Sequence, residues 1–488
     1  MNKIVQILFL LKLGLCSASA QPYFSKTYKF TNNTSSIDQI ILVNDDVFLK
    51  YGGICDLNNE CSGLSKLSSS GELVWNNRLE TFDAAFFDAM QYRNDRFQIG
   101  GHIISDSSSN IYLIELDTEG DSSIVFQEQY DEVRVLQNIL QVSDSITFLV
   151  GLNFNSKKIT LYKLKNNILV EENELIFESI NENPIEMRYF LDQILLLSEV
   201  QLNNFKTYSY LFNLNSLFSL LSNIQFREIE VTSPFSNLEV NGNFIYVTQG
   251  FIQTDDITMN RTPPILYKID STGNIVWELE FRTRHNKGLN DLIVAENGDI
   301  ICVGTERSTD RALWDFDMGW IIRVSNEGEL LWEKSVIDTR YDYHGRGSFE
   351  AIEEASNGDL IIGGWIADTT SANINNLTLN SWLVRLTSEG CFFDNCDSTQ
   401  IITNVNSIDV DLPEFEIYPN PSLDILYVQP LNEKKYSLSI FNLSGELIYS
   451  DYNLRGENSI KTSAFNKGLY FLKVTQDGSF SFRKVIKL

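Results

Sequence analysis

A twelve-residue pattern recurs along the chain and constrains the fold more than any other feature of the sequence. Two apolar residues three positions apart precede a polar turn that ends in glycine, and in the clearest copies tryptophan follows four positions later. The best copies are 64–75, 266–277, 321–332 and, without the tryptophan, 383–390. Glycine supplies the positive φ of a tight hairpin, and tryptophan is a large apolar anchor. Each copy therefore predicts a β-hairpin that ends in an outer strand.

Weaker copies of the pattern extend the series into a regular repeat. The copy at 113–120 keeps the glycine, and eroded copies occupy 161–167 and 211–216. The turns then fall near residues 71, 120, 167, 216, 273, 328 and 390, with an average spacing of about 53 residues. Repeats of this length are typical of propeller blades, so seven units predict a seven-bladed ring. A stacked solenoid is the alternative architecture.

A second hairpin precedes the glycine–tryptophan hairpin in the clearer units, so each unit predicts four strands. Asn–Gly lies between apolar runs in 238–247, 292–304 and 351–363, which is the strongest short-range signal for a β-hairpin. The last unit has no tryptophan strand after Gly390, whereas the strand expected at 25–30 has no partner. We expect this strand to complete the last blade, because that pairing closes the ring and removes open edges.

These features resemble the seven-bladed β-propeller repeat of many exported bacterial proteins, over residues 21–400. The resemblance implies an all-β fold and says almost nothing about function. Hydrophobic residues make up 43% of the chain and aromatic residues 12%, which fits strands around a sizeable core. The formal net charge of -27 would repel phosphate backbones, so nucleic acid is not an expected partner.

Residues 1–20 have the features of a secretory signal peptide. A short basic region precedes the largely apolar segment 4–15, and Ala18 and Ala20 form the small-x-small pattern of a cleavage site. The apolar segment is too short to span a bilayer, and no later segment has 18 consecutive apolar residues. A lipoprotein anchored at Cys16 is the alternative, although the preceding leucine is larger than a lipobox favours. We expect a secreted or surface-displayed protein without a transmembrane segment.

Four cysteines form two pairs that are local in the sequence. Cys55 with Cys61, and Cys391 with Cys396, can each close a small loop. Export would place them in an oxidising environment, where disulfides form. Cys302 lies in an apolar run and is expected to be an inert thiol in the core. No metal site is expected from these cysteines, because the chain has only three histidines and no Cys-x-x-Cys motif.

The C-terminal residues 413–488 form a separate unit after a polar stretch at 401–412 that we interpret as a linker. Short alternating runs with turn residues between them predict a small Ig-like β-sandwich. The unit closely resembles the C-terminal sorting domain of type IX secretion substrates. The matching positions are Tyr418, Pro419, Asn420, Pro421, Gly445, Gly468, Tyr470, Lys484 and Lys487. The resemblance implies the type IX secretion machinery as a partner and, in that family, frequent cleavage of the domain; an accessory sandwich is the alternative.

The long loops of the predicted propeller lie on one face, and that face is the expected binding surface. Arginine, histidine and aromatic residues gather in these loops, which suits an anionic or sugar-like ligand. All three histidines, including His102, map to this face. The candidate ligand-binding residues are Arg282, Arg284, His285, Arg307, Arg311, Trp314, Tyr341, His344, Arg346 and Trp365. The competing interpretation is that the arginines pair with neighbouring aspartates and brace the loops.

No catalytic constellation stands out, and no cofactor is expected. The sequence lacks a Gly-x-Ser-x-Gly elbow, a P-loop and a His-Glu-x-x-His motif. Asp315 and Asp317 suit a glycosidase, but 65 acidic residues make chance pairs common. A calcium site at 56–60 is a further alternative, because this stretch has alternating oxygen donors. It lacks, however, the glycine and the final glutamate of an EF-hand loop.

We therefore expect a propeller that binds a glycan or another protein. Two alternatives stay open at this point. One is an extracellular polysaccharide hydrolase or lyase with its site on the loop face of blades 5–7. The other is a structural component of the cell surface that takes no small ligand.

Overall fold

The computed structural model describes most of the chain from residue 23 onward. The described residues are 23–31, 34–56, 59–78, 85–105, 107–202, 206–229, 234–251, 263–281, 286–307, 317–338, 346–368, 378–392, 396, 399–402, 406–409, 415–442, 447–476 and 479–488. The regular elements in these ranges are all strands. None of the described residues belongs to a helix that is long and apolar enough to cross a membrane. The expected signal peptide at 1–20 lies outside the described residues.

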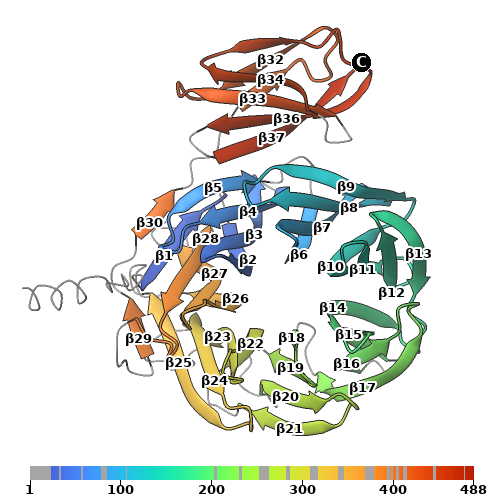
Figure 1. The fold of residues 1–488 in the computed structure, drawn as a ribbon, viewed down its shortest axis with the longest axis vertical. Coiled ribbons are helices and arrows are strands. Elements are labelled where there is room, and N and C mark those ends of the chain that lie inside the picture. Colours follow the sequence, from blue (N-terminus) through green and yellow to red (C-terminus); the bar gives the residue numbers. More distant parts are fainter. Residues whose placement is uncertain are drawn as a thin grey trace, which may run out of the picture.

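Seven antiparallel sheets stand around a central axis as the blades of a propeller (Figure 1). In each blade the chain runs from the innermost strand outward. Blades 1 and 2 contain β2 (Thr34–Val43), β3 (Asp46–Asp56), β4 (Asn59–Leu67) and β5 (Leu73–Arg78), then β6 (Ala85–Arg93), β7 (Arg96–Ser105), β8 (Ser108–Asp117) and β9 (Ser122–Tyr130). Blades 3 and 4 contain β10 (Arg134–Ser143), β11 (Ile146–Asn153), β12 (Lys158–Lys165) and β13 (Ile168–Glu174), then β14 (Asn181–Phe190), β15 (Gln193–Gln201), β16 (Thr207–Leu214) and β17 (Leu220–Ile229).

The remaining three blades complete the ring. Blades 5 and 6 contain β18 (Pro234–Asn241), β19 (Phe244–Phe251), β20 (Ile265–Asp270) and β21 (Ile275–Glu280), then β22 (Asn286–Val294), β23 (Ile300–Arg307), β24 (Asp317–Val324) and β25 (Leu330–Asp338). Blade 7 contains β26 (Gly347–Glu354), β27 (Leu360–Asp368), β28 (Thr378–Leu386) and β1 (Phe24–Lys29). The predicted seven-bladed, all-β architecture is confirmed.

Strand β1 supplies the outer strand of blade 7, as the sequence predicts. It pairs antiparallel with β28, from Phe24 opposite Arg385 to Tyr28 opposite Ser381. Tyr28 is fully buried, and its hydroxyl donates a hydrogen bond of 2.7 Å to the carbonyl of Gly71 in blade 1. The two ends of the propeller are thereby joined, so the ring is closed and blade 7 has four strands like its neighbours.

The repeat in the sequence corresponds to contacts between neighbouring blades. Trp277 of blade 5 packs on Gly328 in the outer turn of blade 6, where an added Cβ would lie 2.9 Å from the indole. Gly328 has a φ of 88°, which residues with side chains rarely adopt. The Trp277 indole nitrogen also donates to the carbonyl of Asn326 in that turn at 3.1 Å. Glycine and tryptophan therefore recur together because the outer strand of one blade covers the outer turn of the next.

The basic residue within the repeat makes a second contact between blades. Arg323 of blade 6 donates to the carbonyl of Ser388 in blade 7 at 2.8 Å. Arg385 of blade 7 donates to the carbonyl of Ser69 in blade 1 at 2.9 Å and pairs with buried Asp359 at 2.8 Å. The cation satisfies a turn carbonyl that the next blade would otherwise leave unpaired. Blade 7 therefore contacts blade 1 in the way that blade 6 contacts blade 7.

The hydrophobic core lies between blades, where the facing sheets share one set of side chains. Phe48 and Trp75 of blade 1 pack with Phe97 and Ile99 of blade 2, and similar clusters join the other neighbouring blades. Sheets that pack face to face bury one another's apolar side chains. Each blade is therefore stabilised by its neighbours, which makes the inner channel wall a rigid support.

After blade 7 the chain follows the rim of the ring and adds a parallel strand to three consecutive blades (Figure 1). Strand β29 (Thr399–Ile402) pairs with β25, β30 (Asn406–Asp409) with β1, and β37 (Ser479–Lys487) with β5. The segment 401–412 that we expected to be a linker thus contributes to two of these strands. Its residues 403–405 and 410–412 lie outside the described residues.

Residues 415–488 form the predicted second domain, a sandwich of two small sheets. One sheet contains β31 (Phe415–Tyr418), β32 (Ile425–Pro430) and β35 (Asn458–Lys461). The other contains β33 (Tyr436–Asn442), β34 (Leu447–Leu454), β36 (Gly468–Gln476) and β37. Leu426 and Val428 of the first sheet pack with Leu438 and Leu472 of the second in a separate core.

Candidate functional site

Three of the ten candidate ligand-binding residues lie in the part of the chain that the structure describes. They are Arg307, Arg346 and Trp365; outside the described residues lie Arg282, Arg284, His285, Arg311, Trp314, Tyr341 and His344. Residue 315, one half of the carboxylate pair that suits a glycosidase, also lies outside them. The loop-face patch as a whole therefore stays a prediction.

The three described residues of this patch make local contacts. The Arg307 guanidinium binds both carboxylate oxygens of Asp317, at 2.6 and 3.3 Å, in a bidentate ion pair. Asp317 also bridges through its backbone to Arg346, whose side chain is exposed. The Trp365 indole donates to the Glu350 carboxylate at 3.0 Å, and burial raises the pKa of that carboxyl to about 7. The Arg307–Asp317 ion pair is the kind of contact expected if the arginines of the loop face pair with neighbouring aspartates and brace the loops.

His102 does not belong to an exposed binding surface. It lies on β7 with 3% of its surface exposed, and burial lowers its pKa to about 4. The imidazole is therefore neutral at physiological pH and is part of the interior of blade 2.

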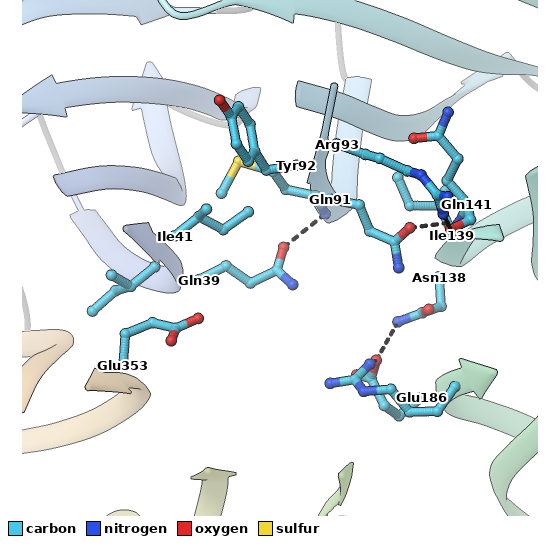
Figure 2. A pocket seen from close by; sticks show the side chains of 13 residues that line it. Gln39, Ile41, Gln91, Tyr92, Arg93, Asn138, Ile139, Gln141, Glu186 and Glu353 are labelled. Carbon is cyan, nitrogen blue, oxygen red and sulfur yellow. Dashed lines mark hydrogen bonds and ion pairs between the residues drawn. The ribbon is translucent and has the colours of Figure 1, made fainter. Parts of the chain in front are cut away.

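A cavity of about 560 Å³ opens at the centre of the ring (Figure 2). Its walls come from β2, β6, β10, β14 and β26, the innermost strands of blades 1, 2, 3, 4 and 7. The lining residues lie toward the ends of these strands, next to the turns that lead into the second strands. The cavity is therefore at the turn end of the ring, opposite the long loops that precede the innermost strands.

A β-bulge in the innermost strand helps to place polar side chains in this wall. The pairing of β2 with β3 shifts between Ile37 and Gln39, and that of β10 with β11 shifts between Leu136 and Asn138. The strand β14 has the same shift just before Glu186. An extra residue re-aims the side chain that follows it, which explains how a polar residue in an apolar run reaches the channel.

Two glutamine side chains join neighbouring blades and keep a hydrogen-bond donor in the cavity. The Gln39 carbonyl oxygen accepts the backbone N–H of Met90 at 2.7 Å, and that of Gln91 accepts the backbone N–H of Gln141 at 2.5 Å. Figure 2 shows both amide nitrogens directed into the cavity. Neither nitrogen has a hydrogen-bond partner among the described residues. Each glutamine thus uses its acceptor for the fold, while its donor faces the cavity.

The opposite part of the wall is rich in acceptors. Asn138 donates to the Glu186 carboxylate at 3.2 Å, while its own side-chain oxygen is buried without a partner among the described residues. Arg188 forms an ion pair with Glu186 and another with Glu239, the latter at 3.2 Å. Glu353 lies across the cavity from Glu186, on the same side as Gln39 (Figure 2).

Burial changes the protonation of two carboxyl groups around the channel. Burial raises the pKa of Glu353 to about 8, and nearby Asp291 and Glu239 raise it further while Arg188 lowers it. Burial also raises the pKa of Asp291 to about 7, although the carboxylate accepts the backbone N–H groups of Ile352 and Leu292. Glu353 is therefore largely protonated at neutral pH and can donate a hydrogen bond into the cavity.

The arrangement is suited to binding a polar molecule that is uncharged. Its free donors come from Gln39, Gln91 and protonated Glu353, and its apolar surface comes from residues such as Ile41. Among the described residues, no group of three or more His, Cys, Asp or Glu could hold a metal ion. The cavity wall therefore offers hydrogen-bonding groups on an apolar support, as ligand pockets commonly do.

The sequence interpretation overlooked this cavity, although a signal was present. Gln39, Gln91 and Gln141 each interrupt an apolar run three to five positions before an inner turn, at intervals of about 50 residues. A polar residue repeated at one place in the innermost strand of a ring must face the axis or a neighbouring blade. The long loops drew attention because their composition was unusual, whereas these amides are single residues in ordinary strands.

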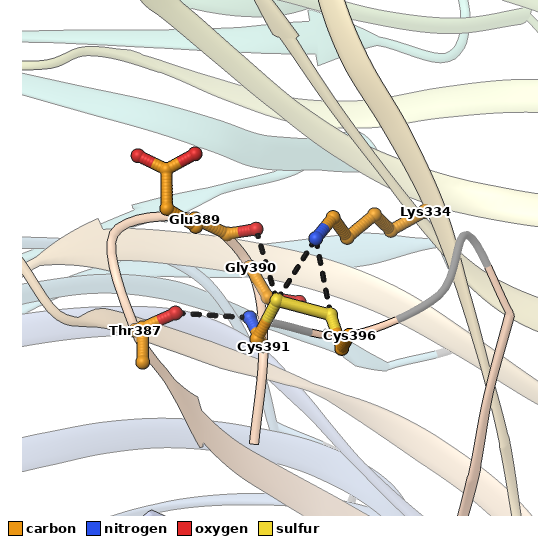
Figure 3. The surroundings of a disulfide bond; sticks show 6 residues. All are labelled: Lys334, Thr387, Glu389, Gly390, Cys391 and Cys396. Carbon is orange, nitrogen blue, oxygen red and sulfur yellow. Dashed lines mark hydrogen bonds between the residues drawn. A yellow bond between two sulfur atoms is a disulfide. The ribbon is translucent and has the colours of Figure 1, made fainter. Parts of the chain in front are cut away.

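The predicted disulfide between Cys391 and Cys396 is confirmed (Figure 3). It closes a loop directly after blade 7, and the Lys334 ammonium lies 2.9 and 3.0 Å from the two sulfur atoms. Cys61 is also disulfide-bonded, whereas the side chain of its expected partner, residue 55, lies outside the described residues. Cys302 is a buried free thiol whose pKa is raised by burial, as expected of an inert core residue.

The described residues of the sorting motif hold the two ends of the C-terminal domain together. The Asn420 side chain donates to the carbonyl of Lys484 at 2.7 Å and accepts the backbone N–H of Ile486 at 2.9 Å. The Tyr418 ring stacks on Tyr427, and the buried Tyr470 donates to a backbone carbonyl. Of the other motif positions, Pro419 and Pro421 follow cis peptide bonds, Gly468 and Lys487 begin and end paired strands, and residue 445 is outside the described residues.

Comparisons with known proteins bear on the C-terminal domain and on the fold. Residues 416–488 match the model of the secretion system C-terminal sorting domain. No curated protein matches the sequence. The β-propeller domain of the Trilobed protease from Pyrococcus furiosus is similar in structure, with a TM-score of 0.42 and 11% identity over 75% of this chain and 100% of that chain. The Dos1 propeller has a TM-score of 0.42 and 9% identity over 80% of this chain and 98% of that chain.

At these TM-scores the solved structures say nothing about the activity of this chain. The propeller is established by its seven sheets and its closed ring, and the sorting domain by the match to residues 416–488. A sorting domain of this kind implies the secretion machinery as a partner and export as the destination. The chain is a seven-bladed β-propeller protein that carries a type IX secretion sorting domain and is exported by that route.

Proposed function

We propose that the exported propeller is a binding protein, secreted or displayed at the cell surface, whose ligand enters the central cavity. The proposed ligand is the uncharged end of a glycan chain. Hydroxyl groups both donate and accept hydrogen bonds, which matches a wall where donors and acceptors alternate. A volume of about 560 Å³ is within the range of small-molecule pockets and fits a short saccharide.

The unpartnered polar groups of the cavity carry this proposal. The Asn138 side-chain oxygen is buried without a partner among the described residues, and the Gln39 and Gln91 amides face the cavity. A buried polar group left unpaired costs about 1–3 kcal/mol, and the Asn138 oxygen is such a group, whereas the two glutamine nitrogens face the open cavity. A ligand hydroxyl would supply the missing partner, since the rest of each side chain is already held by the neighbouring blade.

Catalysis is the second candidate, and one observation favours it. Glu353 is protonated near neutral pH because its pKa is raised to about 8, which is the property of a general acid in glycoside hydrolysis. The other carboxylate in the described wall, Glu186, is engaged by Arg188 and Asn138. The described lining contains no serine, cysteine or histidine that could act as a nucleophile or base. Binding is therefore the simpler use of these residues.

The test is a glycan array probed with the full exported chain, followed by calorimetry on each saccharide that binds. Asn138→Ala and Glu353→Ala should each weaken binding by about tenfold or more, which corresponds to about one lost hydrogen bond. Arg346→Ala on the loop face is the matched control and should leave the affinity unchanged.

Three other outcomes would replace the proposal. Loss of binding in Arg346→Ala with full binding in Asn138→Ala would move the site to the loop face. Release of reducing ends from an oligosaccharide, abolished by Glu353→Gln, would establish the hydrolase. If no saccharide shows saturable binding, the structural surface component becomes the better hypothesis.

A further inference from the structure

The sorting domain has an apolar outer face that is covered in this structure. Along β36, Tyr470, Leu472 and Val474 point into the core of the sandwich. The alternate residues, Phe471 and Lys473, point away from that core. Yet Phe471 is only 7% exposed, and the Lys473 side chain 12%. Residues on the outer face of a small sandwich are expected in water, so another part of the chain must cover them.

Blades 1 and 2 of the propeller provide the cover. Ile124 of β9 packs against an apolar cluster on the sorting domain that consists of Phe441, Leu469 and Phe471. The ammonium of Lys473 lies 3.0 Å from the carboxylate of Asp121, in the outer turn of blade 2. We call the four sorting-domain residues Phe441, Leu469, Phe471 and Lys473 the docking face.

Backbone pairing adds a third contact beside the docking face. The residues 479–481 of β37 pair in parallel with 76–78 of β5, so one sheet continues from blade 1 into the sorting domain (Figure 1). Both strands would otherwise be free edges. An added strand is a common mode of recognition, because main-chain hydrogen bonds supply the affinity while neighbouring side chains supply the specificity.

We propose that the folded propeller acts as a reversible latch on its own export signal. The docking face is closed while the sorting domain lies on blades 1 and 2, and it becomes accessible only when the domain swings away. Three short contacts that are each weak suit a latch that opens: a few strand bridges, one ion pair whose aspartate is 76% exposed, and one small apolar cluster.

A partner that binds the docking face must present the same groups as blade 2. These groups are an apolar side chain next to a carboxylate, as in Ile124 and Asp121. The export machinery that handles this domain would therefore compete with the propeller for the same residues. This inference is independent of the central cavity and its ligand.

A charge-swap experiment on the full chain tests the latch. In Asp121→Lys and in Lys473→Asp, two like charges face each other, so backbone amide hydrogen exchange in 76–78 and 479–481 should become about three- to tenfold faster. The double variant Asp121→Lys/Lys473→Asp restores the opposite charges and should restore the protection. Glu119→Lys, in the same turn and exposed, is the control and should exchange as the native chain does.

Native exchange in both single variants would show that the domain does not open there and would overturn the proposal. The proposal also fails if the double variant exchanges as fast as the single ones, because the ion pair then has no part in the docking.

Removing the apolar contact of the docking face should accelerate hydrogen exchange more than the charge swap does. Phe471→Ser removes the centre of the docking face, whereas Leu447→Ser changes an exposed leucine on the same sheet and serves as the control. In Phe471→Ser, exchange in 76–78 should rise more than tenfold while the core strand 436–442 stays protected. If 436–442 also loses protection, the sandwich itself has unfolded, and the charge-swap series decides. Unchanged exchange in 76–78 with an intact core would refute the latch.

Discussion

The inner wall and the outer rim of this propeller treat polar groups in opposite ways. At the rim, cations and indoles of one blade are bonded to turn carbonyls of the next, as Arg385 is to Ser69 and Trp277 to Asn326. At the inner wall, Gln39 and Gln91 are bonded on one side only, and Asn138 retains an oxygen without a partner among the described residues. The rim therefore uses its polar groups to hold the fold together, whereas the inner wall leaves some of them without a partner among the described residues.

The largest effect is expected at the seam between blades 7 and 1. Arg385→Leu should lower the free energy of unfolding by about 3–5 kcal/mol, because it leaves the buried Asp359 carboxylate without its partner. Arg96→Leu, which removes an ion pair whose arginine is 60% exposed, should cost less than about 1 kcal/mol. Urea unfolding of both variants provides the comparison. Equal losses in the free energy of unfolding would mean that the buried ion pair at the seam contributes no more to stability than the exposed one.

Two turn glycines provide the next comparison between rim and inner wall. Gly328 at the rim and Gly242 at an inner turn both have positive φ, but an added Cβ meets the Trp277 ring only at Gly328. Gly242→Ala should cost about 1 kcal/mol for backbone strain, and Gly328→Ala about 2–3 kcal/mol because the clash adds to it. Thermal or urea unfolding measures both. If the two alanine variants are equally stable, the indole moves aside at no cost.

The inner wall should make the protein less stable as the pH rises. A carboxyl whose pKa is raised by folding binds its proton more tightly in the folded state, so its penalty is absent below about pH 4.5 and grows as the pH approaches 8. Glu353, with a pKa raised to about 8, and Asp291, with about 7, both act in this sense. The free energy of unfolding should therefore fall between about pH 5 and pH 8.

Glu353→Gln isolates the contribution of one of these groups. It should flatten the pH dependence and recover on the order of 1–2 kcal/mol at pH 8, since Glu353 is partly solvated at the cavity. The measurement is urea unfolding at several pH values. A slope that Glu353→Gln does not change would mean that its carboxyl is ionised in the native state.

The smallest effect is expected on the loop face. Arg346→Ala should change stability by less than about 0.5 kcal/mol, because the described Arg346 side chain is exposed and contributes through its backbone. Arg307→Ala should cost about 1–2 kcal/mol, because it leaves the Asp317 carboxylate without a bidentate partner. Differential scanning calorimetry can rank the two. The reverse order would show that Arg346 holds a loop in place.

The periodic elements of the fold could be predicted because local rules govern them. A glycine that must take positive φ and a tryptophan on an alternating strand are visible wherever they recur, so seven hairpins and the missing strand of the last blade could be counted. The eroded blades 3 and 4 had weaker signals, because Asn166 and Asn167 take the positive φ in one and Phe218 in the other. The proposed binding residues were harder to find, because each glutamine taken singly looks like an ordinary strand residue and only the interval of about 50 residues between them sets them apart.

The sequence by itself determined the blades, the closing strand and the sorting domain, because each is specified by residues close together in the chain or by a repeated local pattern. Only the tertiary structure decided the central cavity and the covered docking face. The cavity draws Gln39, Asn138 and Glu353 from strands far apart in sequence, and the docking face meets residues more than 300 positions away. Such contacts depend on how blades are arranged around an axis, and no local pattern encodes that arrangement.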